Sequence, residues 1–141
     1  RKEREIVNKA YAQSQIDSDL LYVSLDDMSN CATKLPNLKN CRSKSIPDTA
    51  LVRADLSAAL FGKTSANSNY TADLFLDVGN VYGSGANATI NFLLESLMRM
   101  KELPPHLFIQ VDGSRTNKNK VFFAFISHLV EKGIFSKVNI N

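Results

Sequence analysis

Two acidic residues stand directly after apolar runs of strand-like composition, and they are the strongest candidates for chemistry in the chain. Asp26 follows the run LLYVSL (20–25), and Asp112 follows LFIQV (107–111). If these two strands are parallel neighbours, about 4.8 Å apart, their carboxylates emerge at the same edge of the sheet. Two carboxylates that close repel each other, and a bound divalent cation relieves the repulsion.

The ligand type sets the expected metal and the expected reaction. Oxygen-only ligands favour Mg²⁺ or Mn²⁺ over Zn²⁺. Such ions activate a water or hydroxyl and stabilise the leaving oxygen of a phosphodiester. Asp26 and Asp112 are therefore the predicted metal ligands and catalytic residues. Asp77, within LFLDVGN, offers an alternative, because this stretch superficially resembles the acid-bearing strand of a PIN-type nuclease.

Two polar segments near these acids are candidates for contact with nucleic acid. Asn117, Lys118 and Asn119 precede a helix-like run, where side chains and helix amides could bind a phosphate. Asparagines at this place are equally suited to capping the helix, so both interpretations stay open. Lys34 belongs to the segment 28–44, which has four basic residues and no acid. That segment is either a solvated loop or a loop that faces nucleic acid.

Hydrophobic periodicity gives the elements that must position these residues. A weakly amphipathic helix is expected at the start, and strands, helices and a last strand follow it. The strands at 20–25, 50–61 and 72–78 are joined by loops, which favours antiparallel pairing. The later strands should be parallel, since a helix separates them. This order predicts an α/β fold with a mixed five-stranded sheet flanked by helices. The expected helices are 1–16, 87–103 and 120–132, the last ended by Gly133, and the expected later strands are 107–111 and 135–140.

Composition limits the class of protein. The 141 residues are 44% hydrophobic and 22% charged, which suits one globular domain. The net charge of +3 permits a nucleic-acid partner without requiring one. No apolar run approaches the roughly 20 residues of a membrane span, so no membrane partner is expected. The spacing of Cys31 and Cys41 is not a zinc pattern; we expect a reduced intracellular pair, with a disulfide as the alternative.

Three stretches carry a resemblance to a known fold family. They are LYVSLDDMSNCATKLP, GANATINFLLESLM and LFIQVDGSRTNKNKVFFAFISHLVEKGIFSKVNI. Together with the order of elements and the acids after the first and fourth strands, they resemble the ribonuclease H-like domain of transposases and integrases. The likeness is to an uncharacterised eukaryotic transposase-like domain found in proteins derived from mobile elements. It covers residues 20–141 and leaves 1–19 as an N-terminal lead-in helix.

The resemblance implies a DDE-type transposase domain that cleaves or joins phosphodiester bonds in DNA, in a nuclear or intracellular setting. Asp26 and Asp112 would then be the first and second ligands of Mg²⁺ or Mn²⁺. The family's third acid follows the last strand, so we expect a fragment that stops before it and is inactive alone. Asp27 and Gly113 depart from the family pattern. The alternative is a domesticated, catalytically inactive module that binds nucleic acid or protein.

Overall fold

The computed structural model describes residues 2–27, 54–61, 71–78, 85–112 and 119–141. Helices and strands follow one another in the predicted order. The helices in the described part are α1 (Lys2–Ser14), α2 (Ala86–Met98) and α3 (Lys120–Glu131). The strands there are β1 (Leu20–Asp27), β2 (Ala54–Phe61), β3 (Thr71–Val78), β4 (His106–Val111) and β5 (Lys137–Ile140).

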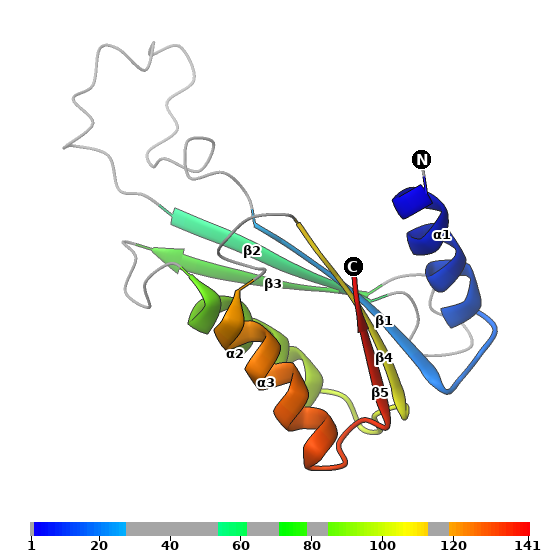
Figure 1. The fold of residues 1–141 in the computed structure, drawn as a ribbon. Helices are drawn as coiled ribbons and strands as arrows, with labels where there is room; N and C mark the ends of the chain where they lie inside the picture. Colours follow the sequence, from blue (N-terminus) through cyan, green and yellow to red (C-terminus); the bar gives the residue numbers. More distant parts are fainter. Residues whose placement is uncertain (1, 28–53, 62–70, 79–84, 113–118) are drawn as a thin grey trace, which may run out of the picture.

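One mixed sheet joins the five strands in the order β3-β2-β1-β4-β5. The pairs β1–β2 and β2–β3 are antiparallel, and the pairs β1–β4 and β4–β5 are parallel. Helices α2 and α3 lie on one face of the sheet and α1 lies on the other (Figure 1). The predicted α/β architecture is confirmed, with three antiparallel strands first and a β-α-β unit last.

The main core lies between the sheet and the pair α2–α3. Strands β1 and β4 alternate toward it, and their inward side chains are buried together with those of both helices. In α3 the buried positions follow i, i+4, i+7 spacing, which gives the helix one apolar stripe facing the sheet. The buried members include Leu21, Val23, Leu25, Leu93, Leu97, Leu107, Ile109, Val111, Phe122, Ile126, Leu129 and Phe135.

A smaller apolar cluster attaches α1 to the opposite face of the sheet. Its buried members are Ala10 of α1, Tyr22 of β1 and Phe108 of β4. The rings of Tyr22 and Phe108 are stacked with their centroids 5.7 Å apart. Tyr11 meets Tyr22 edge-on at 5.6 Å. The helix expected only as a lead-in is therefore packed on the sheet, and its small Ala10 permits the close approach.

Two predicted element boundaries are wrong. The second helix was expected to run from 87 to 103, but α2 ends at Met98, with Arg99 as its C-cap. Pro104 disfavours helical dihedrals at the residue before it, and the chain must turn to enter β4. The last strand begins at Lys137 rather than at 135, because Phe135 turns into the core and is buried.

The buried faces of the helices are narrow. Met98 of α2 and Phe123 of α3 are apolar residues in these helices, yet their exposed fractions are 74% and 43%. A helix resting on a flat sheet buries a narrow stripe, here Leu93 and Leu97 in α2. Apolar side chains at the margin of that stripe remain in contact with solvent.

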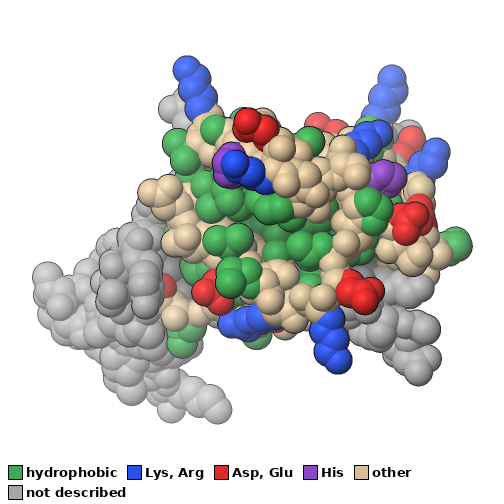
Figure 2. Space-filling model, turned by 90° about the horizontal axis from the view of Figure 1, so that it is seen from below, with side chains coloured by type: hydrophobic (Ala, Val, Ile, Leu, Met, Phe, Trp, Pro, Cys, Tyr) green, Lys and Arg blue, Asp and Glu red, His purple; other side chains and the backbone are tan. Residues whose placement is uncertain are grey.

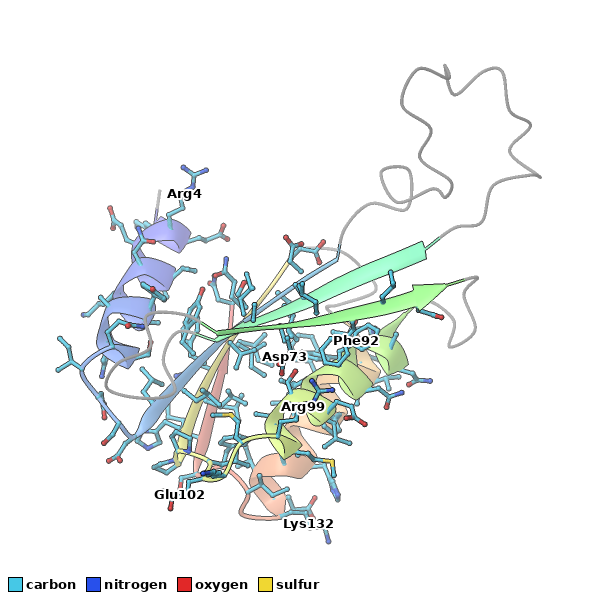
Figure 3. The ribbon with its side chains drawn as sticks, turned by 180° about the vertical axis from the view of Figure 1, so that it is seen from behind. Arg4, Asp73, Phe92, Arg99, Glu102 and Lys132 are labelled. Carbon is cyan, nitrogen blue, oxygen red and sulfur yellow. The ribbon has the colours of Figure 1, made fainter. Side chains whose placement is uncertain are left out.

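An aromatic and ionic cluster holds the edge strand β3 against α2. The ring of Phe75 stacks on that of Phe92, with centroids 4.7 Å apart. The guanidinium of Arg99 lies 5.7 Å from the centroid of Phe75. The same group lies 3.8 Å from a carboxylate oxygen of Asp73, toward which it points in Figure 3. These contacts fix which face of β3 lies toward α2.

Candidate functional site

The register of β1 and β4 places Asp26 and Asp112 at neighbouring positions on one edge of the sheet. The strands are parallel, and Leu25 pairs with Val111. Asp26 follows Leu25, Asp112 follows Val111, and both side chains are exposed. Neighbouring strands lie about 4.8 Å apart, so the two carboxylates are within reach of one ion. The condition on which the sequence prediction depended, that these strands are parallel neighbours, is met.

Alternation along β1 shows which face of the sheet carries the first acid. Leu21, Val23 and Leu25 belong to the core under α2 and α3. Tyr22 belongs to the cluster under α1, and residues two apart in a strand share a face. Asp26 is therefore on the α1 face, at the carboxyl end of β1.

The two carboxylates of Asp26 and Asp112 form a ligand pair of the kind that suits Mg²⁺. Within the described residues, no group of three or more His, Cys, Asp or Glu side chains could hold a metal ion. Mg²⁺ is commonly bound through one or two carboxylates, with waters and substrate phosphates completing its octahedral shell. Two exposed carboxylates at adjacent strand ends suit that mode of binding and do not suit a closed zinc site.

Asn119 acts as the N-cap of α3. Its backbone is extended, with φ −131° and ψ 170°, and its Oδ1 accepts a hydrogen bond from the backbone N–H of Phe122 at 3.0 Å. Capping, one of the two interpretations left open by the sequence, is therefore confirmed for this residue. Asn117, Lys118 and Lys34 lie outside the described residues, as do Cys31 and Cys41.

Asp77 does not join the Asp26–Asp112 pair. It lies in β3, which is separated from β4 by β2 and β1 in the sheet. Its side chain is only 6% exposed, because it sits on the face covered by α2 and α3. The alternative of a site built on Asp77 therefore draws no support from the positions of the other two acids.

Seen from below, the molecule presents the end opposite to the carboxyl edge of β1 and β4. Hydrophobic side chains gather in the middle of this face, and charged side chains surround them (Figure 2). The Asp and Glu side chains visible there stand apart around the margin instead of forming a cluster. No two neighbouring carboxylates comparable to Asp26 and Asp112 are visible on this face (Figure 2).

A cavity that the sequence did not indicate lies beside the acidic edge. It has a volume of about 510 Å³ and is lined from α1 by Glu3, Arg4 and Asn8, and from the sheet by Gln110 and Asn141 among others. Two of its walls come from segments more than a hundred residues apart in sequence. Only the packing of α1 on the sheet creates it, and local sequence patterns contain no signal for that packing.

Comparison with known proteins yields a match to a family model. A model described as a domain of unknown function (DUF7869) matches residues 50–141, well over half of the chain. The matched range includes Asp112 and Asn119, while Asp26 and α1 precede it. No curated protein matches the chain. In the described part of the chain, no helix is long and apolar enough to span a membrane.

Proposed function

Because the chain belongs to the DUF7869 family, whose description gives no function, we propose a function from its own geometry. We propose a DDE-type transposase-like core with a ribonuclease H-like fold. Its activity would be metal-dependent cleavage or strand transfer at phosphodiester bonds of DNA. Asp26 and Asp112 would hold the metal ion, Mg²⁺ or Mn²⁺.

The single observation that carries this proposal is the pairing of Leu25 with Val111. It brings two exposed carboxylates, which are 86 positions apart (112 minus 26) in sequence, to adjacent strand ends. Like charges side by side repel each other, and two neighbouring carboxylates provide oxygen ligands for a hard cation.

The order of elements supports the proposal. Asp26 lies near the end of the first strand, Asp112 directly follows the fourth, and helices α2 and α3 flank β4 along the chain. This is the order in which the resemblance to transposases and integrases places the first two metal-binding carboxylates. The fold alone hosts many activities, so the argument for function rests on the acids.

Each residue of the proposed site would have a distinct role. Asp26 and Asp112 would hold the ion at the exposed edge, within reach of a DNA strand. When bound, the ion would activate a water or hydroxyl and neutralise charge on the phosphodiester. Lys34, Asn117 and Lys118 would contact backbone phosphates, and Asn119 would hold the start of α3 in place as its N-cap.

A second candidate is a module that binds nucleic acid without cutting it. The observation in its favour is that the described residues bring two carboxylates together and no third metal-binding side chain. Such a module would keep the fold and the basic residues of a transposase-like core. It differs from the enzyme in one measurable property, the conversion of DNA.

Titration with Mn²⁺ tests the metal site. We expect Mn²⁺ to raise the melting temperature of the chain, because a ligand at 100 times its dissociation constant stabilises a fold by about 2.7 kcal/mol. Asp26→Asn and Asp112→Asn should each abolish most of this effect, since an amide is a poor ligand for a hard cation. Glu131→Gln, at the exposed end of α3, removes an equal charge and serves as control. Equal stabilisation of the parent protein and all three variants by Mn²⁺ would contradict the metal site.

Incubation with labelled DNA separates the two candidates. The enzyme predicts Mn²⁺-dependent nicking that Asp112→Asn abolishes, provided that the Mn²⁺ titration has first shown metal binding. The binding module predicts retention of DNA in a gel-shift assay with no change in strand length. Nicking that persists unchanged in Asp112→Asn would contradict the assignment of this carboxylate.

A further inference from the structure

We propose that the cavity between α1 and the carboxyl ends of β4 and β5 binds one nucleotide of a single nucleic-acid strand. The choice of nucleic acid as substrate class rests on the proposed function. The cavity, about 510 Å³ in volume, falls within the range of small-ligand pockets. Its position is the first argument: Val111 lines it, and Asp112 is the next residue. A nucleotide held in this cavity would lie next to the phosphodiester bond that the proposed metal site at Asp26 and Asp112 acts on.

The polar lining is rich in carboxamides. Asn8, Gln110 and Asn141 line the cavity, and each amide carries two donors and one acceptor oxygen. Carboxamides complement the edges of nucleobases, which present donors and acceptors side by side. The amide lining therefore matches a base better than it matches an apolar ligand.

The sheet holds Gln110 by its side-chain amide and Asn141 by its backbone. The hydroxyl of Tyr22, which is buried, donates a hydrogen bond to Oε1 of Gln110. Asn141 is tied to β4 by its backbone: its N–H donates to the carbonyl of Ile109 at 2.9 Å, and its carbonyl accepts from Val111 at 3.1 Å. Groups held in advance lose less entropy when a ligand binds, so this wall is suited to recognition.

Charge at the mouth of the cavity suits the phosphate. Arg4 stands at the beginning of α1, at the end of the molecule where the helix meets the carboxyl ends of the strands (Figure 3). Its side chain is exposed, and a guanidinium binds phosphate through paired hydrogen bonds. Glu3, also in the lining, can accept from an amino group of the base.

A second cavity gives the rest of the strand a path. It has a volume of about 320 Å³ and lies between α1 and the beginnings of β4 and β5. Lys9 of α1 and Lys137 of β5 line it, together with His106. Both cavities share α1 as one wall and β4 as the other. A strand lying along α1 would therefore meet Lys9 and Lys137 before its nucleotide reaches the cavity at Arg4.

Binding of a fluorescein-labelled single-stranded oligonucleotide to the 141-residue chain, in EDTA, tests the proposal. We expect the double variant Arg4→Ala with Asn8→Ala to weaken binding about tenfold, because it removes one phosphate contact and one base contact. Both residues are exposed on α1, so the variant should keep its melting temperature. Lys132→Ala, on the other side of the sheet, removes one positive charge and should change affinity less than about twofold.

Three results would overturn the proposal. An equal loss for Lys132→Ala would mean that the oligonucleotide follows net charge and not the cavity. No loss for the double variant would mean that the strand does not enter it. The proposal would also be overturned if polyglutamate displaced the labelled oligonucleotide as effectively as unlabelled oligonucleotide does. The site would then bind any polyanion, including an acidic peptide, and would not recognise a nucleotide. EDTA removes divalent ions, so this outcome is independent of the Mn²⁺ titration, and either proposal can fail alone.

Discussion

The hydroxyl of Tyr22 donates a hydrogen bond to the side-chain oxygen of Gln110, which links the central strand β1 to its parallel neighbour β4. The Tyr22 ring is itself held between Phe108 and Tyr11 of α1. One residue thus connects the N-terminal helix, the centre of the sheet and the wall of the cavity beside Asp112. Local sequence gives no sign of this link, since Tyr22 reads as one more apolar residue of a strand.

Tyr22→Phe should lower the free energy of unfolding by about 1 kcal/mol, because it keeps the ring and removes the donor to a half-buried oxygen. Urea denaturation of the two proteins measures the difference. A double-mutant cycle with Gln110→Ala isolates the bond, and the two effects should fail to add by about 0.5 kcal/mol or more. Strict additivity would show that the hydrogen bond contributes nothing.

Truncation of Leu93 in α2 should destabilise the protein much more than truncation of Leu74 in β3. Leu74 is 67% exposed on the outer face, whereas Leu93 of α2 is fully buried against the sheet. Leu93→Ala should cost about 3 kcal/mol through lost burial and a cavity. Leu74→Ala removes the same atoms from an exposed site and should cost about 0.5 kcal/mol or less. Thermal unfolding followed by circular dichroism compares them; similar losses would show that Leu74 is covered in solution.

The sequence was sufficient for the part of the fold that carries the acids. β1 and β4 are short runs that are apolar on both faces, which is the pattern of central parallel strands. A strand, helix, strand order at the end of the chain then required β4 and β5 to be parallel, as they are. The position of Asp26 beside Asp112 also requires the pairing of β1 with β4, which the sequence analysis offered only as a condition and the structure supplies.

The orientation of β3 could not be predicted, since period-2 alternation separates two faces without saying which one is buried. Its leucines point outward and Asp77 points inward, the reverse of what hydrophobicity suggests. The contacts of Phe75 with Phe92 and Arg99 decide the matter. These are long-range contacts, and the cavity under α1 depends on contacts of the same kind.

Arg99→Ala should lower stability by less than about 1 kcal/mol, although the residue touches both Asp73 and Phe75. Its side chain is 60% exposed, so water and salt screen both interactions. Urea denaturation at low and at high salt should show the loss shrinking as salt rises. A loss that is large and independent of salt would mean that Arg99 acts through packing instead.

Gly133→Ala should destabilise the protein by about 1 kcal/mol, because Gly133 has a φ of +70° after the end of α3. A Cβ there would meet no atom within 4 Å, so the cost would be backbone strain alone. Gly133→Asn should cost less, since asparagine tolerates this conformation better. Equal losses for both variants, measured by thermal unfolding, would point to a contact and not to strain.

Asn119 allows its two roles to be separated by one pair of substitutions. Its Oδ1 caps α3, so Asn119→Ala should cost about 1 kcal/mol in urea denaturation. Asn119→Asp keeps the acceptor and adds a negative charge at the helix N-terminus, so stability should be retained or rise slightly. If Asn119 also contacts a phosphate, the second interpretation that the sequence left open, Asn119→Asp should weaken DNA binding severalfold despite its intact fold, because like charges repel.

Asn119→Asp distinguishes the two roles because it should retain the stability of the protein while weakening its affinity for DNA. A gel-shift titration of duplex DNA at fixed salt gives the affinity, and the melting temperature of the same samples gives the fold. Lys120→Ala, at the first residue of α3, is the control for loss of a general positive charge at this helix end. Unchanged affinity in Asn119→Asp would leave Asn119 with the cap alone and the proposed phosphate contacts with Lys34, Asn117 and Lys118.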